Sequence, residues 1–237
     1  MTMNTVFKKH ERKSNQIIVF ANQKGGVGKT SLCASVCNRY AEVKHKFCAV
    51  DADAQRSLWK LREENKQDHP DWQEPYFIYH FDDLDSEKYT TELMEDLQDV
   101  DGDVFIDAPG SLSKPGMIPL IKGADVVIIP YSYDENTVLS TIAFIRFLKR
   151  IFKDNESKMP KIIFVQNRYN AKWGRKGDFP AWELTDKGFA EFGTLAPRVA
   201  LSSEMTRVNT FYNTPKLKEL IAPLCDFLDK NIFKTNS

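Results

Sequence analysis

The sequence predicts a single α/β domain built on a doubly wound, mostly parallel β-sheet. Apolar strand-like runs alternate with helix-like segments, a glycine-rich turn follows the first run, and an aspartate ends later ones. The chain has 237 residues, of which 42% are hydrophobic and 28% charged, so it is long enough to bury a real core. We expect residues 16–237 to form this domain and the polar, basic residues 1–15 to form a short flexible arm.

The glycine-rich turn lies in residues 20–31, whose sequence is FANQKGGVGKTS. It follows an apolar run over residues 16–22 that predicts a strand, and it leads into helical spacing over residues 29–43. Its glycines lack a Cβ atom, so the backbone can curl until successive N–H groups and the helix N-terminus point at one anion. The pattern predicts a cradle for nucleotide phosphates. The expected contacts are Gly25, Gly26, Val27, Gly28, Lys29, Thr30 and Ser31.

Two side chains carry the chemistry of this cradle. Lys29 should reach the β- and γ-phosphates, and the Thr30 hydroxyl should ligate a Mg ion that bridges them. Gln23 stands where the ordinary P-loop pattern has glycine. What remains, Lys-Gly-Gly-Val-Gly-Lys-Thr, resembles the deviant Walker A motif of the ParA/MinD family of P-loop ATPases. The resemblance implies a P-loop NTPase fold with ATP and Mg as cofactors. It also implies that Lys24 crosses a dimer interface to the partner's ATP phosphates, which makes it a catalytic residue beside Lys29.

A second strand over residues 47–50 ends at Asp51 and leads into Asp-Ala-Asp-Ala-Gln-Arg-Ser. Doubly wound folds place ligand-binding loops at such carboxyl ends of strands. The segment is similar to an Asp-x-Asp-x-Gln segment of ParA-like proteins, with Ala54 where proline is usual. The resemblance implies that Asp53 orients the attacking water as a catalytic residue and that Asp51 supports the Mg shell. The alternative for Asp51 is a plain strand-end or cap residue, because aspartate favours turns.

A Walker B element is expected further along the chain. After a helix over residues 57–65, a strand over 76–79 and a helix over 90–98, the apolar residues 104–106 deliver Asp107. A carboxylate at the end of such a strand holds Mg, usually through water. The Ala-Pro-Gly-Ser that follows resembles the switch segment with which the family senses the γ-phosphate. The switch residues would be Pro109, Gly110 and Ser111.

The second half of the chain continues the alternation. We expect a buried strand over residues 125–130, a long helix over 134–152 and a strand over 161–166. In the family the end of this last strand contacts the adenine base, which implies cofactor contacts from Asn167 and Arg168.

The last third predicts one contact segment and three further elements. Residues 171–183 mix basic and aromatic side chains, which suits a nucleic-acid or protein contact surface; a mobile loop with no dedicated role is the alternative. A short strand over 195–199, a helix begun by Ser202 or Ser203, and a packed helix over 216–231 are expected to complete the fold.

The composition indicates where the protein is located and whether its cysteines bind a metal. The N-terminus is basic without an apolar signal segment, and no apolar run is long enough to cross a bilayer, so we expect a cytoplasmic protein. The cysteines form no Cys-x-x-Cys pair, which favours buried free thiols over a metal or Fe–S site.

The net charge is zero but unevenly distributed. It is +7 over residues 1–50 (9 basic, 2 acidic), −13 over 51–107 (5 and 18), −1 over 108–145 (2 and 3) and +7 over 146–237 (17 and 10). The acidic stretch would repel DNA, so we expect it to face away from any nucleic acid. The basic C-terminal stretch supplies the candidate DNA contacts Lys172, Arg175, Lys176, Arg198, Arg207, Lys216 and Lys218.

The resemblance covers essentially the whole chain and is strongest to the small ParF-like partition ATPases. It implies a switch that dimerises on ATP and Mg, binds DNA without sequence preference and becomes nucleoid-associated. A centromere-binding, ParB-like partner would stimulate ATP hydrolysis. The alternatives are a membrane- or cargo-positioning ATPase of the MinD type, or a metabolic ligase that uses the same cradle. The C-terminal segment reads as a packed helix rather than a membrane anchor, so no membrane partner is expected.

Overall fold

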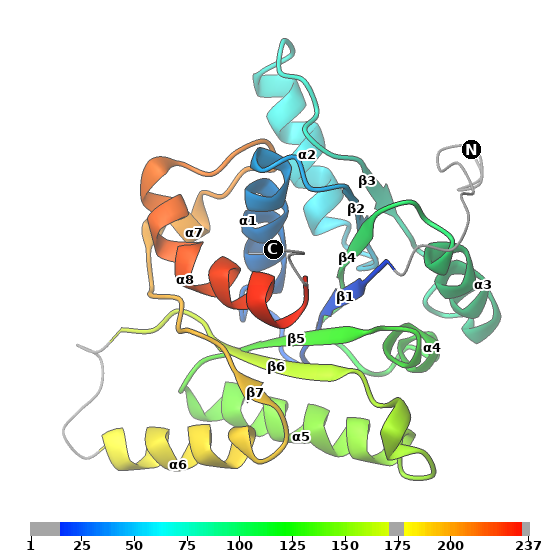
Figure 1. Ribbon diagram of the computed structural model, residues 1–237, viewed down its shortest axis with the longest axis vertical. Helices are drawn as coiled ribbons and strands as arrows, with labels where there is room; N and C mark the ends of the chain where they lie inside the picture. Colours follow the sequence, from blue (N-terminus) through cyan, green and yellow to red (C-terminus); the bar gives the residue numbers. More distant parts are fainter. Residues whose placement is uncertain (1–14, 171–177, 234–237) are drawn as a thin grey trace.

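The expected parallel α/β sheet is confirmed. The structure is a computed structural model that describes residues 15–170 and 178–233; the division between arm and domain thus stays a prediction. Seven parallel strands lie in the order β3-β2-β4-β1-β5-β6-β7 (Figure 1). The strands are β1 Ile17–Phe20, β2 Phe47–Asp51, β3 Ile78–His80, β4 Asp103–Asp107, β5 Val126–Tyr131, β6 Lys161–Gln166 and β7 Thr194–Leu195. The helices are α1 Lys29–Glu42, α2 Ser57–Asp68, α3 Glu87–Gln98, α4 Met117–Lys122, α5 Glu135–Ile151, α6 Phe179–Ala190, α7 Ser203–Thr206 and α8 Pro215–Asn231, with a 3₁₀ turn, η2, at Glu156–Lys158.

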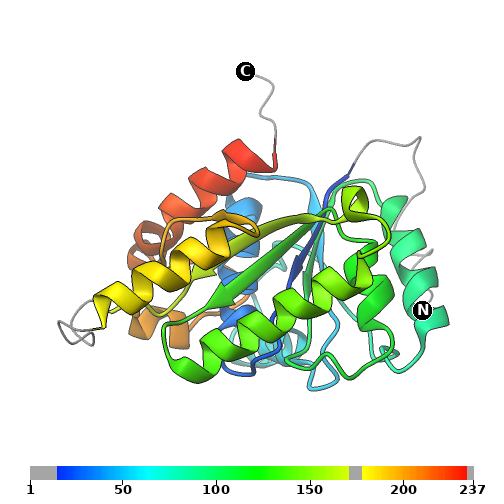
Figure 2. The same ribbon diagram turned by 90° about the horizontal axis from the view of Figure 1, so that it is seen from below.

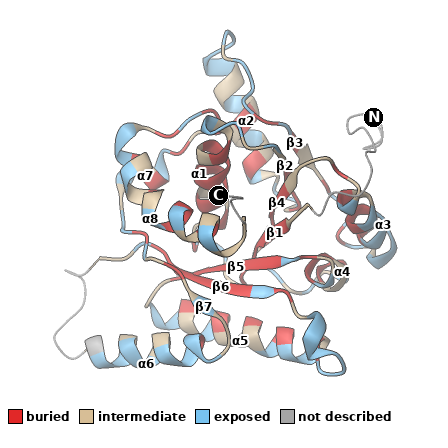
Figure 3. Ribbon diagram, viewed as in Figure 1, coloured by how far each residue is buried: buried red, intermediate tan, exposed pale blue. Residues whose placement is uncertain are grey.

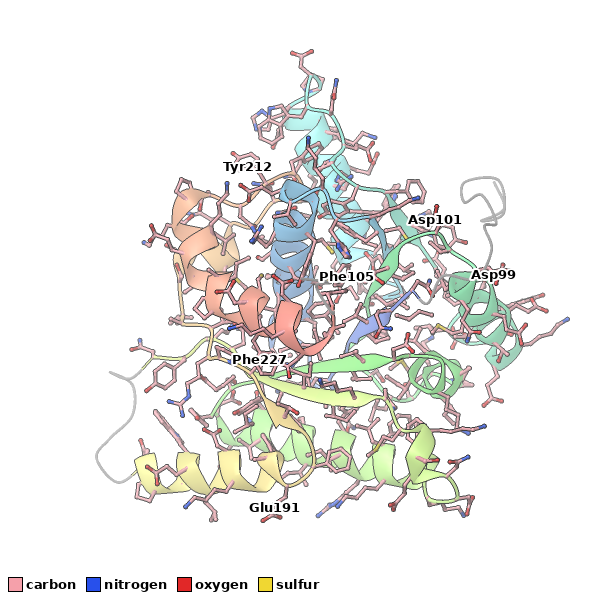
Figure 4. All side chains as sticks on the ribbon, in the orientation of Figure 1. Asp99, Asp101, Phe105, Glu191, Tyr212 and Phe227 are labelled. Atoms are coloured by element: carbon pink, nitrogen blue, oxygen red, sulfur yellow. The ribbon has the colours of Figure 1, made fainter. Side chains whose placement is uncertain are left out.

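Helices cover both faces of the sheet. Because side chains alternate along a strand, Ile17 and Val19 of β1 face α3, α4, α5 and α6, whereas Ile18 and Phe20 face α1, α2, α7 and α8. Figure 1 shows α1, α7 and α8 on one side of β5 and β6, with α5 and α6 on the other, and Figure 2 shows α5 across the near face of the sheet. Burial is concentrated in the strands and in α1 (Figure 3). Phe105 of β4, labelled in Figure 4, contacts the ring of Tyr40 on α1.

The register of the central strands fixes one functional edge. Asp51 of β2 lies opposite Asp107 of β4, Asp107 lies opposite Phe20 of β1, and Phe20 lies opposite Ile128 of β5. Loops that leave these strands therefore start from one row at the carboxyl edge of the sheet. The glycine-rich turn, the Asp51 segment and the Asp107 segment are neighbours for this reason.

Several predicted boundaries are wrong. The first strand stops at Phe20, the third is displaced to Ile78–His80, and the strand expected at 195–199 is only Thr194–Leu195. Helix α4 was not expected, because it is short and contains Pro119. Helix α6 was not expected either, and its first residues replace part of the contact segment predicted at 171–183; residues 171–177 lie outside the described part of the chain.

Other expectations are confirmed. The Ser202 hydroxyl accepts the backbone N–H of Glu204 and so caps α7. Helix α8 buries Leu217 and Leu224 against the protein, as expected for a packed final helix. All four cysteines are free and buried. Within the described residues, no helix is both long enough and apolar enough to span a bilayer.

A buried arginine that sequence reasoning did not single out joins α2 to the segment before α8. Arg62 is 2% exposed. Its guanidinium donates to Glu74 at 2.9 Å and to the Tyr76 carbonyl, the Thr210 hydroxyl and the Thr210 carbonyl at 2.8 Å each. It lies 4.8 Å from the ring of Phe211. A buried cation with this many partners is costly to delete, because its acceptors lose their donors.

We expect Arg62→Ala to lower the free energy of unfolding by about 3 kcal/mol, since it leaves buried acceptors unpaired and opens space beside an aromatic ring. Urea unfolding followed by circular dichroism measures this. Lys60→Ala, an exposed position on the same helix, is the control and should stay within about 0.5 kcal/mol of the wild type. A small loss in Arg62→Ala would contradict a structural role for the cluster.

Candidate nucleotide-binding site

The glycine-rich turn adopts a conformation that only glycine accepts easily. Gly26 has φ 75° and Gly28 has φ 92°, both in the left-handed region. Gly28 is the N-cap of α1, and among the described residues no side chain caps this helix end. The first N–H groups of α1 are therefore left for a ligand, and the helix dipole favours an anion there.

Lys29 curls back over the turn that precedes it. Its side chain is buried, and its Nζ atom donates to the Lys24 carbonyl at 3.1 Å. Burial lowers the pKa of Lys29, while the charges of Asp107 and Asp53 raise it. The ammonium group thus lies inside the turn, where a phosphate would compete well for it.

Thr30 and Asp107, which the sequence predicts to hold Mg, lie in direct contact; their binding of Mg stays a prediction. The Thr30 hydroxyl donates to Oδ2 of Asp107 at 2.6 Å. The other oxygen of Asp107, Oδ1, is buried and has no hydrogen-bond partner among the described residues. Burial raises the pKa of Asp107 to about 7, and the bond from Thr30 opposes the rise. A hydroxyl and an unpartnered carboxylate oxygen fit Mg, which takes few protein ligands and completes its shell with water and phosphate.

Asp51 lies beside this pair but has other partners. Its two oxygens accept the backbone N–H groups of Asp53 at 3.1 Å and of Trp59 at 2.9 Å. The geometry matches the strand-end and cap alternative, so Asp51 shapes the loop and the start of α2; its contribution to the Mg shell stays a prediction. Asp53 is half-buried and accepts the N–H of Gln55 at 2.9 Å. Its role in orienting water also stays a prediction.

The predicted switch segment packs directly on the cradle. A Cβ atom on Gly110 would lie 3.0 Å from the backbone nitrogen of Gly25, so the two backbones are in contact. A cavity of about 340 Å³ opens beside them, with Asp53, Pro109 and Ser111 among its lining residues. The structure therefore brings the cradle, the Asp53 loop and the switch segment together.

Asn167 and Arg168 lie on the other side of the cradle. Asn167 is buried, and its Nδ2 atom donates to the Val27 carbonyl at 2.9 Å. Arg168 is exposed and has φ 58°. Adenine contacts by these residues stay a prediction.

The candidate DNA contacts are not one uniform patch. Lys172, Arg175 and Lys176 lie outside the described residues. Two others have partners: Arg198 pairs with Asp186 at 2.9 Å, and Lys218 pairs with Glu42. Arg207 and Lys216 are exposed, and neither forms an ion pair within the described part of the chain. The contacts themselves stay a prediction.

Sequence reasoning missed the loop that follows β3. Asp82 forms a two-pronged ion pair with Arg56, next to the Asp53 loop, and Asp85 pairs at 2.6 Å with Lys114, three residues after the switch segment. The loop therefore contacts both segments that flank the cradle. The local sequence shows only an acidic surplus, which cannot indicate which cation each carboxylate meets.

The parallel sheet, the glycine cradle at the start of α1 and the Thr30–Asp107 pair define a P-loop nucleotide-binding protein. The profile of the CobQ/CobB/MinD/ParA nucleotide-binding domain matches residues 18–189, and the chain belongs to this family. No curated protein sequence matches the chain.

Solved structures share the fold. The apo form of McdA from Cyanothece is 17% identical with a TM-score of 0.69, covering 90% of this chain and 99% of its own. A putative plasmid partition protein from Borrelia burgdorferi bound to AMPPNP is 19% identical with a TM-score of 0.65, covering 92% and 100%. MinD from Pyrococcus horikoshii, complexed with Mg-ADP, is 18% identical with a TM-score of 0.67, covering 94% and 100%.

The buried Asp107 predicts how stability depends on pH in the metal-free protein. Its pKa is about 7 when folded against 3.8 in a model peptide, so between these values the folded state binds more protons than the unfolded state. Stability should fall as pH rises from 4 to 7 and then level off. Asp107→Asn should remove this component and be more stable than the wild type at pH 8.

Thermal unfolding in EDTA at several pH values measures the effect. Asp226→Asn, at an exposed position of α8, is the control and should keep the wild-type profile. Equal pH profiles for the wild type and Asp107→Asn would show that the burial of Asp107 does not raise its pKa.

The contact between Gly110 and Gly25 predicts a second effect. Gly110→Ala should weaken Mg-ATP binding roughly tenfold, because the added methyl group displaces the cradle backbone. Isothermal titration calorimetry measures this. Gly188→Ala on α6 is the matched control, since nothing lies within 4 Å of the added atom there, and it should bind Mg-ATP as the wild type does. Unchanged affinity in Gly110→Ala would contradict close packing of the switch on the cradle.

Proposed function

We propose that this protein is an ATPase that switches between nucleotide states to partition DNA. In this proposal, ATP and Mg join two copies of the chain, the dimer binds DNA without sequence preference, and hydrolysis releases it. The observation that carries the proposal is the convergence of Lys29, the Thr30–Asp107 pair and Gly110 on one turn. Such a site can couple the presence of a γ-phosphate to the position of a loop.

In this proposal, different residues of the site bind the phosphates, the metal and the attacking water. The N–H groups of α1 and the Lys29 ammonium bind and orient the phosphates. Thr30 and Asp107 would hold Mg, which would neutralise negative charge on the phosphates. Asp53 would orient water; the cavity that it borders beside the switch segment supports this role.

Dimerisation would place Lys24 in the partner's site. Lys24 is half-buried; burial raises the pKa of Asp134 at the start of α5, but hydrogen bonds from Ser132 and Thr137 and, to a smaller extent, the charge of Lys24 lower it below its ordinary value. Close by, a cavity of about 840 Å³ lies between the starts of α5 and α6, and Leu139 borders it. Leu139 is 56% exposed and Leu184 of α6 is 72% exposed. Leu139 is thus an exposed apolar side chain at the edge of this cavity, and Leu184 lies on α6, which also borders it; we infer a protein–protein interface on this face.

DNA binding would use cations that have no partner in the chain. Arg207 and Lys216 fit this requirement within the described residues, whereas Arg198 and Lys218 would first have to leave Asp186 and Glu42. Binding of this kind depends on neutralised phosphates and therefore weakens with salt. We infer that a ParB-like, centromere-binding protein stimulates hydrolysis and that the ATP-bound protein lies on the nucleoid.

Partition is favoured over the MinD type of membrane positioning by one observation. An anchoring helix needs a free apolar face, but α8 buries Leu217, Ile221, Leu224 and Leu228 against the protein. A metabolic ligase would use the same cradle and is distinguished by the experiment below.

The proposal predicts that DNA binding requires ATP and Lys24. In a filter-retention assay with unrelated DNA sequences, binding should appear with ATP-Mg, be absent with ADP-Mg and fall steeply between about 50 and about 200 mM salt. Lys24→Ala should lose it, because the partner's phosphates lose their second lysine. Lys60→Ala, which removes a lysine side chain at an exposed position of α2, is the control and should still bind DNA with ATP-Mg.

Sedimentation analysis of the same samples checks the dimer. ATP should double the mass of the wild type and of Lys60→Ala but leave Lys24→Ala monomeric. DNA binding that is independent of nucleotide would reject the proposed switch.

A further inference from the structure

The end of β6 contacts the cradle through one side chain. The Nδ2 atom of Asn167 donates to the Val27 carbonyl at 2.9 Å, and Asn167 itself is 2% exposed. Val27 is the residue before Gly28, the N-cap of α1. A residue 140 positions away in sequence therefore contacts the centre of the phosphate turn.

Asn167 is held firmly by its own neighbours. Its backbone N–H donates to the Tyr131 carbonyl of β5 at 2.7 Å, and its Oδ1 atom accepts the N–H of Arg168 at 2.9 Å. Gln166 donates to its carbonyl at 3.2 Å. The backbone of Asn167 is thus fixed to β5 at the end of β6, and the N–H of Arg168 holds its side-chain amide, which makes the amide a rigid support for a loop.

Glycine at position 28 is required on two counts. Its φ of 92° is strained for any residue with a side chain, and a Cβ atom there would lie 2.4 Å from Nδ2 of Asn167. The two residues are therefore in direct contact, and the Asn167 amide fills the space that a side chain at position 28 would need.

The hydrogen bond to Val27 controls the orientation of a peptide group. A trans peptide is planar, with its C=O and N–H pointing in opposite directions. While Asn167 holds the Val27 carbonyl, the N–H of Gly28 must point away from Asn167. If this peptide turned over, a carbonyl oxygen would replace that N–H and would repel a phosphate.

We propose that Asn167 is a positioning residue for the phosphate cradle: it fixes the peptide between Val27 and Gly28 so that the Gly28 N–H faces the nucleotide phosphates. The proposal rests on the nucleotide-binding role of this site and concerns how that site is formed. It predicts that Asn167 controls affinity for the phosphate chain, whereas an adenine contact would control affinity for the base.

The test compares two probes, ATP and inorganic tripolyphosphate, each with Mg. By isothermal titration calorimetry, Asn167→Ala should bind both about tenfold more weakly than the wild type, by the same factor. Asn167→Asp should lose more, because its carboxylate oxygen repels the Val27 carbonyl. Loss of ATP affinity with tripolyphosphate unchanged would overturn the proposal in favour of a base contact, and unchanged affinity for both probes would also overturn it.

Asn213→Ala separates positioning from general loss of stability. Asn213 is 3% exposed, and its Nδ2 atom donates to the Ser35 carbonyl at 2.8 Å, further along α1. This variant loses a comparable buried hydrogen bond but not the contact with the turn. It should melt at a lower temperature than the wild type and still bind tripolyphosphate normally. Equal loss of affinity in Asn213→Ala and Asn167→Ala would overturn the proposal.

A double-mutant cycle tests the contact without any ligand. Gly28→Ala should lower the melting temperature less in the Asn167→Ala background than in the wild type, because the amide that it meets is gone. Additive shifts would contradict the contact. The calorimetric and melting experiments on Asn167 use no DNA. A failure of DNA binding would therefore contradict the proposed partition function without affecting the test of Asn167.

Discussion

Because β4 lies directly beside β1, Asp107 ends its strand opposite Phe20, the last residue of β1, from which the glycine-rich turn leads into α1. This parallel pairing brings a carboxylate to the first turn of α1, where Thr30 donates to it at 2.6 Å. The pairing of β2 with β4 adds the Asp51 loop to the same edge. Most of the site follows from this register, since each loop only has to continue in the direction that its strand gives it.

The site concentrates charge where water is scarce. Lys29 and Asp107 are both buried. Burial lowers the pKa of Lys29 and raises the pKa of Asp107, so it favours the neutral form of each side chain. Each charge also opposes the shift of the other, so the pair is partly balanced before any ligand arrives. In the proposed function, a metal and a phosphate chain would complete that balance and give a partner to Oδ1 of Asp107, which has none among the described residues.

The alternation of strands and helices, the glycine-rich turn before α1 and the aspartate at the end of β4 were accessible from the sequence because each depends on a local pattern. An apolar run that ends in glycines or in Asp107 predicts a strand followed by a loop from the residues of that segment alone. The helix α6 was not accessible, since the segment before it reads as a loop and its burial rests mainly on Phe189 meeting the sheet. The bond from Asn167 to Val27 was not accessible either, because it depends on how two distant strands are spaced. Ion pairs such as Arg56 with Asp82 are hidden for the same reason: charge count does not identify partners.

The loop after β3 holds none of the residues that would contact phosphate or metal, yet it is joined to the segments on both sides of the cavity through Arg56 and Lys114. Its residues form no part of the cradle, so their identity is free of the chemical constraints that fix Lys29 or Thr30. A substitution at Asp82 or Asp85 alters how tightly the two segments are tethered while the groups that hold nucleotide stay unchanged. In the proposed switch, such a substitution would change how readily the two segments move without changing the groups that hold the nucleotide.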